Sequence, residues 1–274
     1  MSAFGAGLQH VPLHRRKAAS SAKRTTLASN DEKAELGFMT DEARRKTMVV
    51  GATGGIGSVV ALRRAREGDA ITLIGRDHVK LSTVADRIGN GHGKPGVLTV
   101  DLGDMDACAK CIHEAAALMG GLDTFIFCAG AHARARTPEA DLPSWDHVLD
   151  VNFRSFVHLI RKGIVPINAS GRGAIIAIGS IPYAHAGAGM NHAAKRALTG
   201  FCEALFEDVR EFGTKVSMIH PGFVATSMSA SPRLQSDLMI QPEDVSDAVQ
   251  YVLQSAPTAC PTEIVIRPQR SPYN

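Results

Sequence analysis

The sequence lacks the features that would assign it to several specialised classes of protein. No apolar run approaches the roughly 20 residues that a helix needs to cross a bilayer. Its five cysteines are an odd number, which is typical of a reducing compartment and argues against a disulfide framework. The formal net charge is only +3, while 45 % of the 274 residues are hydrophobic. The composition therefore predicts a protein with a buried core, and the length suits one α/β domain plus an appendage.

The small positive charge is concentrated at the N-terminus. Residues 1–47 hold nine basic and five acidic residues, whereas the remainder holds 21 basic and 22 acidic residues. A near-neutral body makes nucleic acid an unlikely partner. Residues 1–30 contain five basic residues and no carboxylate, a composition typical of a mitochondrial transit peptide. The alternatives are a disordered basic arm and an arm that docks on a cytoplasmic partner, including a cytoskeletal or other large assembly. We therefore predict an extension over residues 1–46 and a domain over residues 47–274.

Short apolar runs alternate with helical patterns throughout the rest of the chain. Such continuous apolar strands, separated by helices, are typical of a parallel sheet that is buried on both faces. The helical patterns begin near Gly55, Asp77, Asp104, Ser144, Met190 and Gln241. The predicted strands are Met48–Val50, Ala70–Ile74, Gly96–Val100, Thr124–Cys128, Ala174–Ile178, Lys215–Ile219 and Glu263–Ile266. This pattern predicts a single α/β domain with a doubly wound, Rossmann-like parallel sheet.

A glycine-rich segment follows the first predicted strand and opens the first predicted helix. It runs Gly51-Ala52-Thr53-Gly54-Gly55-Ile56-Gly57. Glycines here allow a tight turn and a close approach of a pyrophosphate, and the helix N-terminus offers it unpaired N–H groups. We therefore predict that Gly51, Thr53, Gly55, Ile56 and Gly57 bind a dinucleotide.

The end of the second predicted strand indicates which dinucleotide is bound. An acidic residue there would bind the 2′-hydroxyl of NAD(H), but the sequence has Gly75-Arg76-Asp77. The guanidinium of Arg76 offers a planar, permanently charged fork that suits a 2′-phosphate. We therefore predict that NADP(H) is preferred over NAD(H). The alternative is that Arg76 is an ordinary solvated residue and that Asp77 pairs with it or caps the helix.

These and later motifs, over residues 47–267, resemble the short-chain dehydrogenase/reductase family. The resemblance implies an oxidoreductase that acts on a carbonyl or alcohol. Three positions resemble its catalytic group: Asn152 in Asp150-Val151-Asn152, Ser180 in Ala177-Ile178-Gly179-Ser180, and Lys195, which in the family also binds the nicotinamide ribose. Further cofactor contacts implied by the resemblance fall on Asp101, Leu102, Ala129, Gly130, Pro221, Gly222 and Thr226.

One position departs from the family pattern. The family has a tyrosine four residues before the lysine, where this sequence has Asn191. An amide can donate a hydrogen bond but cannot deliver a proton at neutral pH, and loss of a general acid costs about 10²–10⁴ in rate. Tyr183 or His185, on the loop after Ser180, could replace the tyrosine. Two hypotheses follow: an NADP(H)-dependent reductase with an atypical acid, and an inactive cofactor-binding protein that serves as a structural or assembly subunit.

Two further patterns concern metals and partners. Cys108 and Cys111 have the spacing of metal ligands, with His113 nearby, but no second pair accompanies them. Cysteines three apart on one helix face are far more often packing residues, so we predict no metal site. Two apolar helical stripes, within residues 148–164 and 194–212, face the sheet in the simplest interpretation. In the family the equivalent helices also form oligomer interfaces, so the resemblance implies a homo-oligomer.

Overall fold

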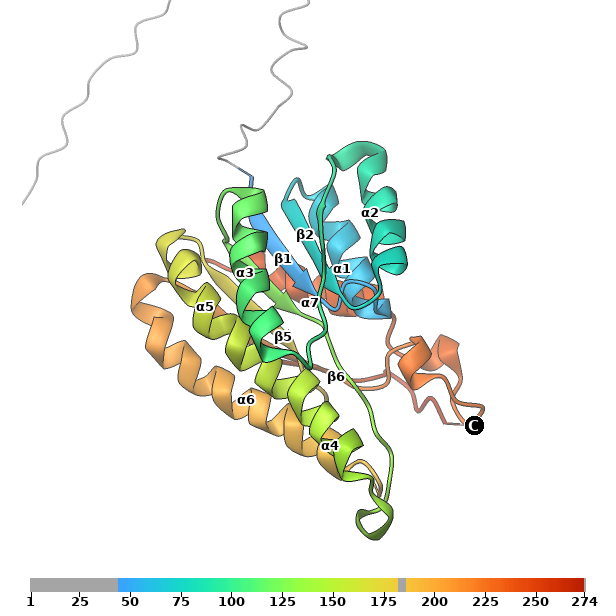
Figure 1. Ribbon diagram of the computed structural model, residues 1–274. Helices are drawn as coiled ribbons and strands as arrows, with labels where there is room; N and C mark the ends of the chain where they lie inside the picture. Colours follow the sequence, from blue (N-terminus) through green and yellow to red (C-terminus); the bar gives the residue numbers. More distant parts are fainter. Residues whose placement is uncertain (1–43, 182–185, 274) are drawn as a thin grey trace, which may run out of the picture. The chain divides into compact units, whose positions relative to one another are not determined.

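The computed structural model describes residues 44–181 and 186–273 (Figure 1). Most of the N-terminal extension, together with Tyr183 and His185, lies outside these residues. Seven strands form one parallel sheet in the order β3-β2-β1-β4-β5-β6-β7, which confirms the predicted doubly wound α/β fold. The strands are β1 (Lys46–Val50), β2 (Ala70–Gly75), β3 (Gly96–Thr99), β4 (Thr124–Phe127), β5 (Ala174–Ile178), β6 (Lys215–Pro221) and β7 (Glu263–Ile266). All seven lie where the sequence predicts them, although β1 begins two residues earlier and β6 ends two residues later.

The helices cover both faces of the sheet. They are α1 (Gly55–Arg66), α2 (His78–His92), α3 (Met105–Met119), α4 (Leu142–Leu149), α5 (Ser155–Ala169), α6 (Gly189–Val209) and α7 (Pro242–Gln254). Helix α1 packs against α2 and α7, whereas α3 packs against α5, and α4 against α6 (Figure 1). The single helix predicted from near Ser144 is interrupted by a π-helical turn over Asp150–Arg154 that joins α4 to α5. No helix in the described part of the chain is long and apolar enough to cross a membrane.

Aspartate side chains fix where three of the helices begin. Asp77 accepts a hydrogen bond from the Lys80 amide, Asp104 from the amides of the second and third helical residues, and Asp141 from the Ser144 amide. A carboxylate at this position satisfies first-turn N–H groups that have no partner within the helix. The caps of α2 and α3 lie close to the sheet edge, so the loops that follow β2 and β3 are short, whereas a longer loop separates β4 from α4.

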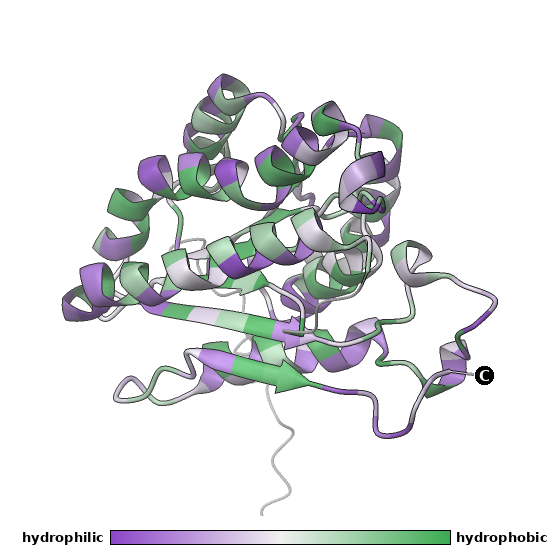
Figure 2. Ribbon diagram, turned by 90° about the horizontal axis from the view of Figure 1, so that it is seen from below, coloured by the Kyte–Doolittle hydropathy of each residue, from purple (hydrophilic) through white to green (hydrophobic). Residues whose placement is uncertain are grey.

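The core consists of two apolar layers, one on each face of the sheet. The layer beneath α3, α5 and α6 contains Phe125, Phe127 and Phe156, whose rings contact one another with centroids 5.3–6.2 Å apart. The layer beneath α1, α2 and α7 contains Leu73 and Ile126. Side chains of β4 therefore enter both layers, as expected for a strand that is buried on both faces. Figure 2 shows the resulting green, hydrophobic segments along the strands.

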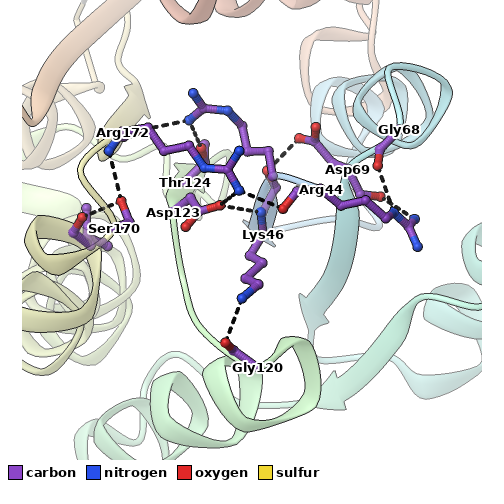
Figure 3. A network of polar contacts seen from close by, with 12 residues as sticks. Arg44, Lys46, Gly68, Asp69, Gly120, Asp123, Thr124, Ser170 and Arg172 are labelled. Carbon is purple, nitrogen blue, oxygen red and sulfur yellow. Dashed lines mark hydrogen bonds and ion pairs between the residues drawn. The ribbon is translucent and has the colours of Figure 1, made fainter. Parts of the chain in front are cut away.

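A polar network fastens the amino ends of the strands (Figure 3). The Lys46 amide and the Arg172 guanidinium both donate to Asp123 Oδ2, at 2.9 and 2.8 Å. Arg45 Nη1 donates to Thr124 Oγ1 at 2.7 Å, and Arg44 Nε donates to the Gly68 carbonyl at 2.9 Å. The folded region therefore includes these three basic residues, 44–46, which the sequence analysis assigns to the extension. The network lies at the edge of the sheet opposite the site described next.

Candidate functional site

A crevice begins at the carboxyl edge of the sheet between β1 and β4. The strand order reverses at this point, because β1 is followed by β2 on one side of it and has β4 on the other. Ligands of doubly wound folds bind outside the strand ends at such a position. Gly51 follows β1 with φ +80°, and a Cβ there would lie 2.6 Å from the Ala129 nitrogen, just beyond β4. Only glycine permits this conformation and this close approach of the two segments.

The glycine segment forms a tight loop into α1. The Gly51 and Ala52 amides both donate to the Ile74 carbonyl, at 2.9 and 3.0 Å, and so bend the chain sharply after β1. A Cβ on Gly57 would overlap the Gly51 carbonyl oxygen, so the helix packs directly on the loop. The first-turn amides of α1 have no partners within the helix, and that turn carries no acidic side chain. The loop therefore presents N–H donors and the positive end of a helix dipole to an anion.

The segment after β6 meets this glycine loop. A Cβ on Gly55 would lie 2.6 Å from Thr226 Cγ2, so the two residues are in close contact. The segment is held in place by its own backbone, because Gly222 N donates to the Ile266 carbonyl and Ala225 N to the Ile240 carbonyl. The structure thus brings Thr226 together with the glycine loop, although the two are about 170 residues apart in the sequence.

The ends of β2 and β3 provide the exposed polar residues on one side of the crevice. Arg76 is exposed directly after β2, and the Thr53 hydroxyl lies 3.5 Å from where a Cβ of Gly75 would be. The carboxylate of Asp77 caps α2 and pairs with Lys80 at 3.4 Å. After β3, Asp101 is exposed and accepts a hydrogen bond from the Gly103 amide, while Leu102 is buried. Arg76, Asp101 and Leu102 are the residues of this group for which the sequence analysis expects cofactor contacts after β2 and β3.

The other side of the crevice contains Lys195 and Asn152. Lys195 Nζ donates to the Ile178 carbonyl at 2.8 Å and lies 3.5 Å from the Ala129 carbonyl oxygen. Asn152, on the π-helical turn, is buried and exchanges two hydrogen bonds with the backbone of Ala131. A Cβ on Gly130 would lie 3.4 Å from Asn152 Oδ1 and 3.8 Å from Lys195 Nζ, so these residues form one cluster.

Burial changes the proton affinity of this cluster. It lowers the pKa of Lys195 to about 8, because desolvation disfavours the ammonium. It raises the pKa of the neighbouring Cys128 thiol to about 12, so the thiol stays neutral at physiological pH. The ammonium has three N–H donors, and the described residues offer it the two carbonyl oxygens named above. The lysine can therefore donate to a ligand, and it can gain or lose a proton near neutral pH.

Asn191 lies one helical turn before Lys195 on α6. Its Nδ2 donates to the Ala133 carbonyl at 2.7 Å, and its Oδ1 accepts from the Ala133 amide at 3.2 Å. Both ends of the amide are therefore bonded to the loop between β4 and α4. This contact could not be found from the sequence, because the two residues are 58 positions apart.

Ser180 follows β5 and is exposed at the same edge of the sheet. Its carbonyl oxygen lies 3.0 Å from Nδ1 of His220, a residue of β6 that the sequence analysis did not select. Because a carbonyl only accepts, Nδ1 carries the proton. Nε2 is buried and lies 3.2 Å from Glu263 Oε1, but it forms no hydrogen bond with the described residues. His220 is 2 % exposed, and this burial lowers its pKa. The sequence shows a histidine directly before Pro221-Gly222, but nothing in the sequence indicates that it contacts Ser180.

The cysteine pair with metal-like spacing lies in the core. Cys108 and Cys111 are buried on α3, and burial raises their thiol pKa values to about 11 and 12. The described residues contain no group of three or more potential ligands that could hold a metal ion. The two cysteines are therefore packing residues of the apolar layer beneath α3.

Comparison with known proteins places these features in context. The sequence profile described as short chain dehydrogenase matches residues 45–237. An uncharacterized oxidoreductase of Staphylococcus haemolyticus is 26 % identical over 234 residues, which cover 84 % of this chain and all of that protein. One from Staphylococcus aureus is 27 % identical over 232 residues, with the same coverage.

Solved structures give a similar result. A metagenomic short-chain oxidoreductase in complex with NADP is 25 % identical, with a TM-score of 0.73 over 85 % of this chain and all of its own. A short chain dehydrogenase from Burkholderia cenocepacia, also in complex with NADP, is 23 % identical and has a TM-score of 0.76. That match covers 81 % of this chain and 96 % of the other, and at this identity it supports the fold alone.

Proposed function

The chain belongs to the short-chain dehydrogenase family, and on that premise we propose that it is an NADP(H)-dependent oxidoreductase that interconverts a carbonyl compound and an alcohol. The observation that supports this most directly is the position of Lys195. Its half-buried ammonium lies beside Gly130 and Asn152, at the strand ends where the glycine loop also opens. A structural protein gains nothing from a half-buried ammonium with one of its three donors unused at this position, whereas a ribose hydroxyl would satisfy that donor.

The residues of the crevice fit a dinucleotide with a 2′-phosphate. A Cβ at Gly51 or Gly57 would clash with neighbouring backbone, so these glycines permit the tight turn and the close helix packing of a dinucleotide-binding loop. Arg76 is exposed at the end of β2, and the nearby carboxylate of Asp77 is already engaged by Lys80. The guanidinium is thus available for a phosphate, and NADP is the cofactor named for the metagenomic relative.

The same geometry suggests roles for the residues near the reacting carbonyl. A bound nicotinamide cofactor supplies or accepts the hydride. In our proposal Ser180 holds the carbonyl oxygen, Lys195 binds the ribose, and Asn152 keeps the loop after β4 in place through Ala131. The amide of Asn191 does not deliver the proton that an alkoxide needs. Lys195 Nζ, with a pKa of about 8, can release one to solvent or product at physiological pH.

The proposal is tested by titrating the full chain with NADPH and NADH and then assaying a panel of ketones and aldehydes. We expect NADPH to bind more tightly than NADH. Turnover should be about 10²–10⁴-fold slower than in an enzyme with a dedicated general acid. Arg76→Ala should weaken NADPH binding while leaving NADH binding unchanged. Absence of binding to either cofactor would contradict the proposal, and so would binding without turnover on every carbonyl tested.

A further inference from the structure

The loop between β4 and α4 is held by hydrogen bonds at every second residue over positions 131–135. Ala131 pairs with the Asn152 amide, Ala133 pairs with the Asn191 amide, and Ala135 N donates to the Gly187 carbonyl at 3.1 Å. Ala131, Ala133 and Ala135 are half-buried, whereas the residues between them are exposed. This alternation is that of an extended chain, in which successive side chains point to opposite sides.

The contact with Asn191 has a specific chemical requirement. A carboxamide has its donor group and its acceptor group on two separate atoms, spaced so that they match the C=O and N–H of a single residue. The two bonds, of 2.7 and 3.2 Å, use both groups on Ala133. The phenol that the family has at this position carries its donor and acceptor on one oxygen atom, so it cannot form this pair.

The same loop forms a wall of a pocket of about 570 Å³, to which Ala133 and Ala135 also contribute. His132 and Arg134 line it from the loop, while Trp145 and His147 line it from α4. Because Asn191 holds Ala133, which lies between His132 and Arg134, a shift of Ala133 would move both of these pocket residues.

We propose that Asn191 is a positioning residue, which holds the β4–α4 loop against α6 and so sets the shape of the pocket that this loop lines. Only the kinetic part of this proposal rests on the proposed function. If the pocket receives part of the carbonyl substrate, loss of the Asn191 contact raises KM several-fold and changes kcat by less than about twofold. A proton donor at position 191 would show the opposite pattern, with a large loss of kcat.

The structural part is tested without any activity, because Trp145 is the only tryptophan of the chain and lines the pocket. The variants are Asn191→Ala, which removes both bonds, and Asn191→Asp, which places a carboxylate against the Ala133 carbonyl. Arg196→Ala, an exposed position on the same helix, is the matched control. We expect acrylamide to quench Trp145 about twofold more strongly in both Asn191 variants and equally in the control.

Hydrogen exchange supplies a second measurement with an internal reference. The Ala133 amide should exchange at least tenfold faster in the Asn191 variants, while the Ala131 amide, held by Asn152, should keep its protection. Unchanged quenching and exchange in variants with a wild-type circular dichroism spectrum would overturn the proposal. So would equal loss of protection at both amides, which would indicate general unfolding of the loop. Failure of cofactor binding would refute the proposed function but would not alter these two readouts.

Discussion

The affinity for NADPH should fall as the pH rises through about 8, because the Lys195 ammonium loses its proton there. Burial is the cause, since desolvation lowers the pKa of this lysine from 10.5 to about 8. The Cys128 thiol beside Lys195 and the 2′-phosphate of the cofactor do not change their protonation between pH 7 and pH 9. The pKa of the Cys128 thiol is raised to about 12, and a phosphate monoester has a second pKa of about 6. A change in affinity between pH 7 and pH 9 therefore reports on Lys195.

The size of the effect follows from the protonated fraction. With a pKa of about 8, roughly 91 % of the lysine is protonated at pH 7 and roughly 9 % at pH 9. If NADPH binds the protonated form and keeps it protonated, the Kd should rise about tenfold over this interval. A lysine with the ordinary pKa of 10.5 would remain about 97 % protonated at pH 9, and the Kd would stay flat.

Stability of the unliganded protein should change in the opposite direction. Between pH 8 and pH 10.5 the unfolded chain binds more protons at this lysine than the folded protein does. The free energy of unfolding should therefore rise as the pH increases across that interval, as far as Lys195 determines it. A higher pH thus favours the folded protein and disfavours its complex with NADPH.

The assay is a fluorescence titration with NADPH from pH 6.5 to 9.5 at constant ionic strength. Lys195→Met should bind weakly at every pH, with no midpoint near 8. Arg76→Ala is the matched control, because a guanidinium does not titrate in this range and its loss should shift the whole curve without changing its shape. A Kd that stays constant between pH 7 and pH 9 would refute the reasoning, as would an unchanged midpoint in Lys195→Met.

Three further predictions concern the sheet edges. Gly57→Ala should destabilise the protein by about 1–3 kcal/mol in a urea titration and weaken cofactor binding, because its Cβ would overlap the Gly51 carbonyl. Gly200→Ala, where a Cβ would meet no atom within 4 Å, should not destabilise it. Asp69→Asn should cost about 3–5 kcal/mol in the same assay, because it leaves the Arg64 guanidinium buried without its bidentate carboxylate; a loss below 1 kcal/mol would contradict this. In thermal melts, acidification from pH 7 to 5.5 should destabilise the wild type more than His220→Asn, since burial lowers the pKa of His220 and the unfolded chain takes up the proton first. Equal sensitivity to pH would refute that account.

Much of the fold could be predicted because its signals are local. Runs such as Thr124–Phe127 are buried on both faces and are apolar almost throughout, so each strand is visible within a few residues of sequence. Helix starts are equally local, because Asp77 and Asp104 cap their own helices within three residues. The glycine loop follows for the same reason, since a strand, a turn and a helix are contiguous there.

The features that could not be predicted depend on pairs of residues far apart in the chain. Asn191 and Ala133 are separated by 58 positions, and His220 and Ser180 by 40. Nothing in either neighbourhood indicates the partner, because an amide or an imidazole has many possible acceptors. The basic residues 44–46 are a similar case. In the sequence they resemble the end of a charged extension. In the fold they contact Asp123 and the carbonyl of Gly68, which are distant in the chain.

Asn191 and Lys195, the two α6 residues of the site, differ in how many of their polar groups have hydrogen-bond partners in the unliganded protein. Asn191 has both of its polar groups bonded to Ala133, so its contacts are complete without any ligand. Lys195 is the reverse, because burial destabilises its ammonium and the described residues offer two carbonyl oxygens for three donors. A methionine there would avoid the cost of desolvation. The lysine is therefore best explained by a ligand, and the asparagine by the loop that it holds. A change at position 195 should accordingly act on cofactor binding, and one at position 191 on the pocket beside it.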